Sequence, residues 1–246
     1  RQAGFSTMQI VFLRASVSVV LLAVIILIRD RSKFRIRLHD GWIFIGTGLI
    51  SFTLFTVCNQ IAMRLCSLSI AAALLYTSPA FILIFSAILF RERLTAAKLI
   101  SIAVTVFGCF LVSGLLTPGA VISTPGVLAG IASGLCYGLY SIFSRYALRH
   151  YSALKCTLWM FIFAGAASVF LIRPAELSVL LNFEEGLTAL ILVVLSTGTP
   201  FILYTMGLSR VEAGKASIIA SFEPVVAALA GVLVFGEPMS VSMIAG

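Results

Sequence analysis

Long apolar stretches alternate with short polar breaks along almost the whole chain. A helix needs about 20 mainly apolar residues to cross the hydrocarbon layer of a bilayer, and the pattern predicts eight such helices. They cover roughly residues 10–28, 42–63, 68–90, 97–116, 126–147, 156–172, 187–208 and 216–235. Because the breaks between them are short, consecutive helices are expected to run antiparallel.

The composition agrees with this pattern. Of the 246 residues, 61% are hydrophobic and 11% are charged, and the mean hydropathy is +1.14. A soluble domain is typically about 45–50% apolar and about 25% charged. The values exclude an ordinary globular enzyme, a disordered chain and a fibrous protein, and they predict an all-α polytopic membrane protein.

The basic residues indicate the orientation of the predicted helices. Most of the 17 Lys and Arg residues fall in breaks on one side, whereas Arg1, Arg64 and Arg173 fall on the other and Arg14 lies within a span. The positive-inside rule assigns the first side to the cytoplasm. The basic residues lie in short runs between apolar segments and form no aromatic-interleaved basic face, so the net charge of +8 indicates topology signals and no nucleic-acid partner.

The chain has no motif for a metal or a cofactor. Its five cysteines are scattered in or beside apolar stretches without a CxxC or Cys/His spacing, which predicts neither a disulfide framework nor a metal site. A GxxxxGK[ST] loop does not occur either, which excludes ATP-driven transport within the chain. We therefore expect no metal and no cofactor.

One internal offset, of 145 residues, matches the chain against itself without a gap. The pairs at this offset are Gly41/Gly186, Ser51/Ser196, Ala71/Ala216, Pro79/Pro224, Phe90/Phe235 and Glu92/Glu237. The helix at residue 42 begins at the cytoplasm, whereas its copy at residue 187 begins outside, so the two copies are predicted to be inverted. Many secondary transporters consist of inverted repeats with a substrate site between them near the bilayer midplane.

The same offset predicts five helices per repeat and ten in the intact protein, of which about eight are complete here. The first repeat would cover residues 1–116 and lack its first helix. The second would cover residues 126–246 with a truncated last helix, and residues 117–125 would form the loop between the repeats.

Three segments resemble the EamA family of the drug/metabolite transporter superfamily. They are residues 74–95 (LLYTSPAFILIFSAILFRERLT), 217–240 (SIIASFEPVVAALAGVLVFGEPMS) and 126–145 (GVLAGIASGLCYGLYSIFSR). The resemblance covers essentially the whole chain and implies a ten-helix, two-repeat, multi-pass carrier of small organic metabolites in a plasma membrane, specifically the bacterial inner membrane. The sequence departs from the family pattern at Arg91, where a glycine is expected, and at Pro238, which follows Glu237.

Glu223 is the sharpest candidate for chemistry because it lies within an apolar segment directly before Pro224. Polar groups inside a bilayer are costly and usually face the bundle interior, and proline frees a backbone carbonyl by removing a hydrogen bond. Glu223 therefore suits proton coupling or cation binding. The alternative is a structural carboxyl that hydrogen-bonds a neighbouring helix, because a Glu-Pro pair is common in the family whatever the substrate.

The helix at 126–147 carries two stripes. Glycines recur every fourth residue from 126 to 138, which allows close approach of another helix. Hydroxyl and aromatic residues form the other stripe: Ser133, Tyr137, Tyr140, Ser141 and Ser144. For Tyr137 and Tyr140, lining of a cavity and interhelical hydrogen bonding are both open.

Polar residues also occur at equivalent positions of the two copies. Asn59 and Gln60 correspond to Tyr204 and Thr205, and the three residues before Pro79 correspond to those before Pro224. A shared central cavity would need such pairs. The predicted substrate-binding residues are Asn59, Gln60, Tyr76, Tyr137, Tyr140, Tyr204 and Glu223.

Three further charged residues are interpreted more simply. Glu92 and Glu237 end their helices three residues before Thr95 and Ser240, which are good N-caps for the next helix, so we interpret both as turn-forming residues. Arg14 lies one turn inside its helix and either extends to the outer interface or binds an anion.

These observations favour a secondary-active transporter that works by alternating access on amino acids or similar amphipathic solutes. Export is implied by the family resemblance alone. The expected partners are a small-molecule substrate and the lipid bilayer, and the sequence leaves open a coupled proton and a homodimer. The alternatives are a non-transporting membrane scaffold or a channel. An intramembrane enzyme is the least favoured, because Glu223 has no second acid and neither histidine lies in a span.

Overall fold

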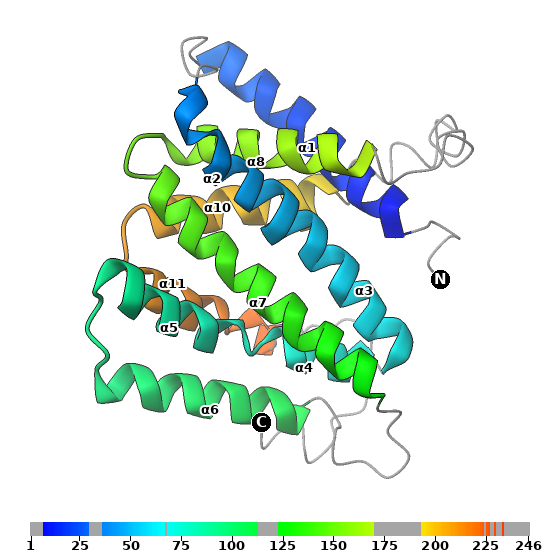
Figure 1. Ribbon diagram of the computed structural model, residues 1–246, viewed down its shortest axis with the longest axis vertical. Coiled ribbons are helices and arrows are strands. Elements are labelled where there is room, and N and C mark those ends of the chain that lie inside the picture. The colour runs from blue at the N-terminus through cyan, green and yellow to red at the C-terminus, as the bar shows by residue number, and fades with distance from the viewer. Residues whose placement is uncertain are drawn as a thin grey trace. The chain divides into compact units, whose positions relative to one another are not determined.

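The computed structural model describes residues 7–29, 36–66, 68–112, 123–169 and 193–223, together with 225, 226, 229 and 233. Every regular element within these residues is a helix (Figure 1). Three helical stretches are long and apolar enough to cross a membrane, namely Leu38–Leu65, Ile70–Phe90 and Thr124–Ala147, and four shorter apolar helices accompany them. The predicted all-α membrane fold is confirmed.

The chain forms two compact units, each built from two separate parts of the sequence. The first unit consists of Arg1–Val57 and Leu139–Arg210, and the second of Cys58–Gly138 and Val211–Gly246. The helices α3 (Phe55–Leu65) and α7 (Thr124–Ala147) each contribute residues to both units.

The remaining elements of the first unit are, in chain order, α1 (Thr7–Arg29), η2 (Leu38–Asp40), α2 (Gly41–Ile45), η3 (Gly46–Leu54), α8 (Ala153–Val169), η6 (Val194–Gly198) and α10 (Thr199–Leu208). Two of them, η3 and η6, are π-helical. Helix α8 packs against α1, α2, η3 and α10, and η6 packs against α1. At Gly48, an added Cβ would lie 2.7 Å from the Met160 carbonyl oxygen, so η3 and α8 meet backbone to backbone.

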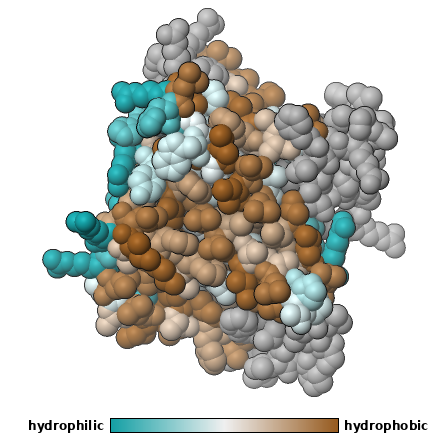
Figure 2. Space-filling view, in the orientation of Figure 1, coloured by the Kyte–Doolittle hydropathy of each residue, from teal (hydrophilic) through white to brown (hydrophobic). Residues whose placement is uncertain are grey.

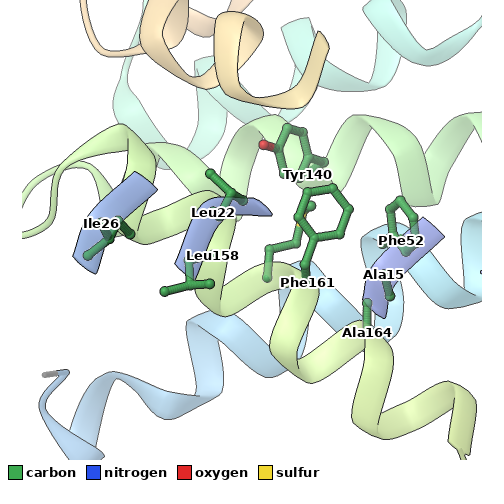
Figure 3. Close-up of a cluster of buried hydrophobic side chains, with 9 residues drawn as sticks. Ala15, Leu22, Ile26, Phe52, Tyr140, Leu158, Phe161 and Ala164 are labelled. Carbon is green, nitrogen blue, oxygen red and sulfur yellow. The ribbon is translucent and has the colours of Figure 1, made fainter. Parts of the chain in front are cut away.

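The core of the first unit lies where α1, η3, α7 and α8 converge (Figure 3). Leu22 and Leu158 are fully buried there. The Phe52 ring packs edge-on against Phe161 and Phe201, with ring centroids 5.3 and 5.6 Å apart. Such contacts fix helix positions without a polar group in the apolar interior.

The second unit contains α4 (Leu68–Leu75), α5 (Ser78–Phe90), α6 (Ala96–Val112) and α11 (Ala213–Ala220). Helix α11 packs against α5 and α6, and α4 packs against α6. The predicted span at 68–90 is therefore broken into α4 and α5 by a turn at Tyr76 and Thr77. Pro79 accounts for the break, because it has no N–H to give to the carbonyl of Leu75.

The 145-residue offset of the sequence recurs in these helix boundaries. Shifted by this offset, α4 coincides with α11 at both ends, and the turn after α4 coincides with the turn at Ser221 and Phe222. The shifted η3 also overlaps η6. The number of helices per repeat and the repeat boundaries stay predictions, and residues 117–122 and 234–246 lie outside the described part of the chain.

Large apolar side chains cover much of the visible surface (Figure 2). Exposed examples include Ile88 at 68%, Val104 and Phe107 at 65%, and Leu203 at 60%. A soluble protein rarely presents a contiguous apolar surface of this kind, whereas lipid tails solvate it readily. The exposed residues are those expected to contact lipid.

Candidate functional site

The break between α4 and α5 is built by local hydrogen bonding around one proline. The Thr77 hydroxyl donates to the Leu74 carbonyl at 2.7 Å, and the Thr77 N–H donates to the same oxygen at 3.2 Å. Pro79 then lies in the first turn of α5, where its missing N–H costs least. The Leu75 carbonyl loses its helical donor, so the break offers a backbone acceptor within an apolar span.

The break after α11 has the same form. The hydroxyl of Ser221 donates to the Ser217 carbonyl at 2.9 Å, and α11 ends in the turn formed by Ser221 and Phe222. Glu223 follows directly, and its side chain is exposed within the described part of the chain. The half-buried Tyr76 lies within electrostatic range of Glu223. The second unit therefore carries one polar side chain at each break, Tyr76 at the first and Glu223 at the second.

The glycine stripe of α7 packs on the first break. An added Cβ at Gly130 would lie 2.4 Å from the Leu74 side chain. At Gly134 it would lie 2.9 Å from the Leu74 carbonyl oxygen and 2.8 Å from the Thr77 hydroxyl. Only glycine allows so close an approach, so these residues hold α7 against the break, as the sequence pattern predicted.

The other predicted binding residues of the second unit lie on α3 and α7. Asn59, Gln60 and Tyr137 are all half-buried. The Asn59 Oδ1 atom is buried and has no hydrogen-bond donor in the described structure. A buried amide oxygen without a donor carries a desolvation cost, which a substrate N–H or a water molecule would remove.

Tyr140 and Tyr204 belong to the first unit and form a hydroxyl network there. Tyr140 is 3% exposed, and its hydroxyl bonds that of Thr205, which also accepts from Thr157 at 3.3 Å. The Tyr204 hydroxyl bonds Ser141 at 2.8 Å. Of the two roles left open for Tyr140, this geometry favours interhelical hydrogen bonding, because the ring lies in the core and its hydroxyl already has a partner. No sequence pattern marks Thr157 for this network, since a threonine in an apolar helix usually bonds its own backbone.

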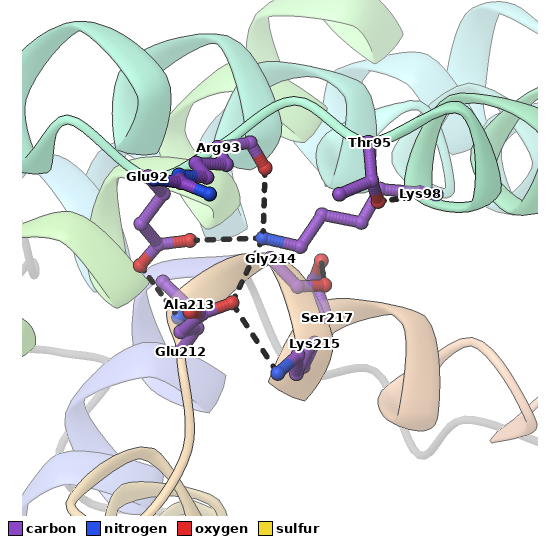
Figure 4. A network of polar contacts seen from close by, with 9 residues as sticks. All are labelled: Glu92, Arg93, Thr95, Lys98, Glu212, Ala213, Gly214, Lys215 and Ser217. Carbon is purple, nitrogen blue, oxygen red and sulfur yellow. Dashed lines mark hydrogen bonds and ion pairs between the residues drawn. The ribbon is translucent and has the colours of Figure 1, made fainter.

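An ionic cluster in the second unit links the connection between α5 and α6 to the start of α11 (Figure 4). The Lys98 ammonium lies 2.8 Å from a carboxylate oxygen of Glu212 and 3.7 Å from one of Glu92. The other Glu92 oxygen accepts the N–H of Ala213 at 3.2 Å. Glu92 therefore caps the first turn of α11, where a negative charge is favourable.

The cluster corrects part of the sequence interpretation. Glu92 does more than form a turn, because it holds a second helix, whereas Glu237 lies outside the described residues. Thr95 is the expected N-cap of α6 and accepts the Lys98 N–H at 3.3 Å. The hydrogen bond from Lys98 lowers the pKa of Glu212 below its ordinary value. The sequence pattern does not predict the role of Lys98 in this cluster, because its partner Glu212 is 114 positions away.

Comparison with known proteins agrees with this fold. The chain matches the EamA-like transporter family over residues 1–114 and 124–246. It is 31% identical over 200 residues to an uncharacterized transporter of Archaeoglobus fulgidus, a match that covers 81% of this chain and 70% of the relative. A second Archaeoglobus transporter is 25% identical over 244 residues, with 98% and 84% covered.

A third relative carries a location in its name. The uncharacterized inner membrane transporter YicL of Salmonella typhimurium is 26% identical over 196 residues, which are 76% of this chain and 65% of the relative. A solved crystal structure superposes with a TM-score of 0.78 at 20% identity and covers 98% of this chain and 83% of its own. This last similarity supports the fold alone.

Proposed function

We propose, from the premise that this chain belongs to the EamA-like transporter family and is a multi-pass inner-membrane transporter, that it carries amino acids or similar small amphipathic solutes by alternating access. Export is the proposed direction, because the family resemblance implies it.

The observation that carries the proposal is the pair of helix breaks in the second unit. Substrate sites of secondary transporters are typically formed by discontinuous helices, whose unpaired backbone groups bind solutes within the membrane. Here the two breaks lie at equivalent positions of the repeat, and α11 packs against α5. One break carries the Tyr76 phenol and the other the Glu223 carboxylate.

The chemistry of these groups supports a solute with an ammonium group and an apolar body. A carboxylate attracts an ammonium, a phenol donates or accepts one hydrogen bond, and an aromatic ring adds apolar and cation–π contact. The sequences around the two breaks, residues 74–80 and 219–225, contain no Lys or Arg. A phosphorylated solute would lack a cation there, whereas an amino acid would place its ammonium beside Glu223.

Alternating access requires that the site open to one side of the membrane at a time. The breaks are suited to this change, because turn residues between short helices can change their backbone angles without loss of a long helix. We propose that Glu223 releases its proton or the solute ammonium when the site changes sides.

Counterflow in proteoliposomes tests the proposal. Vesicles that contain the full-length protein are loaded with unlabelled leucine, and uptake of labelled leucine is followed from pH 5.5 to 8. A carrier shows faster uptake into loaded than into empty vesicles, whereas a pore or a scaffold shows no such difference. The same assay with a panel of labelled amino acids covers the solute class.

The matched variant is Glu223→Gln, which keeps the shape of the side chain and removes its charge. We expect this variant to insert normally, to lose most of the counterflow and to lose the pH dependence of what is left. Glu176→Gln removes a carboxylate far from both breaks in sequence and serves as the control. Wild-type counterflow and an unchanged pH profile in Glu223→Gln would remove Glu223 from the mechanism.

A further inference from the structure

Arg14 is the one charged residue in the apolar helix Phe12–Ile28 of the first unit. Its side chain is half-buried, and its Nε–H donates to the Thr197 hydroxyl on η6 at 2.7 Å. Among the residues that the structure describes, no carboxylate lies within ion-pair distance of this guanidinium. An intramembrane arginine is energetically costly and is usually paired, so its place on α1 needs an explanation.

The surroundings of Arg14 supply a second and independent observation. Ser18 lies one helical turn further along α1, is 0% exposed, and its hydroxyl has no hydrogen-bond partner in the described structure. The Ser18 hydroxyl faces η6, because an added Cβ at Gly198 would lie 3.6 Å from it. An unsatisfied buried hydroxyl is unfavourable. Two donors on one face of α1 thus point to the same π-helical turn.

The turn itself adds two more hydroxyls. Thr197 is fully buried, and its hydroxyl lies 3.5 Å from that of Ser196, whose side chain is exposed. π-Helical turns occur frequently at functional sites. The cluster therefore combines the Arg14 cation with the hydroxyls of Ser18, Ser196 and Thr197. A solute can reach it, because Ser196 is exposed and Arg14 is only half-buried.

We infer that Arg14, with these three hydroxyls, forms a binding site for a carboxylate. The inference goes beyond the proposed function, because Arg14 and the three hydroxyls belong to the first unit, whereas the two helix breaks belong to the second. A guanidinium has five N–H donors, of which Thr197 takes one, and the others match the two oxygens of a carboxylate in a bidentate pair. The single positive charge of Arg14 is balanced by a carboxylate, whereas a phosphate dianion would leave a net negative charge in the apolar helix region.

Chemical protection tests the site without a variant. Phenylglyoxal modifies accessible arginines, and peptide mass spectrometry gives the rate at Arg14 in the purified full-length protein. The probes are leucine and acetate, compared with leucinamide and acetamide at equal ionic strength. We expect each carboxylate to slow the modification of Arg14 by at least about tenfold and each amide to leave it unchanged. Arg149, which is exposed, serves as the internal control.

Equal rates with the carboxylates and the amides would overturn the inference, and so would equal slowing at Arg14 and Arg149. A variant comparison separates binding from packing. Arg14→Gln should lose the preference for leucine over leucinamide in a binding titration, whereas a merely structural role would lower the melting temperature and keep the preference.

The same measurements distinguish this inference from the proposed function. Protection of Arg14 by leucine without leucine counterflow supports the carboxylate site and contradicts amino-acid transport. Counterflow of leucine in Arg14→Gln with the wild-type preference for leucine over leucinamide supports transport and overturns the site.

Discussion

The ionic cluster around Lys98 allows one substitution to be worked through from the structure. Lys98 is 8% exposed, and the side chain of Glu92 is 6% exposed. Lys98→Met keeps the length and the apolar stem of the side chain but removes the ammonium. It takes the Lys98 cation away from the buried Glu92 carboxylate, whereas the hydrogen bond from the Ala213 N–H persists.

The expected cost follows from burial. Removal of one partner from a buried ion pair typically costs about 3–5 kcal/mol, because the other charge is left uncompensated. The side chain of Glu212 is 40% exposed, so solvent screens it, and pairs of that kind contribute about 0.2–1 kcal/mol. We therefore expect Lys98→Met to cost about 3–5 kcal/mol of unfolding free energy and Glu212→Gln to cost less than about 1 kcal/mol.

The assay is equilibrium unfolding of the full-length protein in mixed micelles with increasing denaturing detergent, followed by circular dichroism. A double variant supplies the control: Lys98→Met with Glu92→Gln removes both buried charges and should be less destabilised than Lys98→Met alone. The reasoning is refuted if Lys98→Met costs no more than Glu212→Gln, or if the effects of Lys98→Met and Glu92→Gln simply add.

Three further outcomes follow from single residues. Arg91 has a φ of 54°, in the left-handed region that glycine adopts more readily. Arg91→Gly should therefore raise the unfolding free energy by about 0.5–1 kcal/mol. An unchanged or lowered unfolding free energy in the same detergent titration would contradict this. Gly134→Ala should lower the unfolding free energy by about 1–3 kcal/mol, because the added Cβ would lie 2.9 Å from the Leu74 carbonyl oxygen. Gly207→Ala should lower it far less, because nothing lies within 4 Å of the Cβ that would be added there. The hydrogen bond from Lys98 lowers the pKa of Glu212. The ionised Glu212 carboxylate therefore stabilises the fold above the ordinary glutamate pKa, and this stabilisation is lost as the pH falls through the lowered pKa. Glu212→Gln should flatten the acid limb of a stability–pH curve, and an identical acid limb in the variant and the wild type would exclude this role.

The apolar helices could be predicted from the sequence because they depend on local chemistry. Apolar length gives a span, but the sequence predicts one continuous helix at 68–90, and the break that Pro79 causes before α5 is seen only in the structure. Once the structure shows this break, the repeat offset relates it to the turn after α11. The glycine stripe on α7 also follows, since small residues every fourth position mark one helix face as a contact surface.

The partners of individual side chains could not be predicted in this way. Helical spacing shows which residues share a face, but it does not show which other helix that face meets. Lys98 and Glu212 are 114 positions apart, and Tyr140 and Thr205 are 65 apart. Tyr140 is predicted equally well as a cavity residue or as a core residue, and only its packed surroundings in the first unit distinguish the two.

The structure connects the ionic cluster to the candidate site through a single short helix. Glu92 and Lys98 hold the N-terminal end of α11, and Glu223 follows the turn at its other end. Eight residues of α-helix span only about 12 Å, so a displacement of the first turn also moves the far end of α11, where the turn before Glu223 begins. The cluster thereby helps to set the position of the carboxylate that the proposed function requires, which explains physically why a buried, costly group of charges lies at the start of this helix.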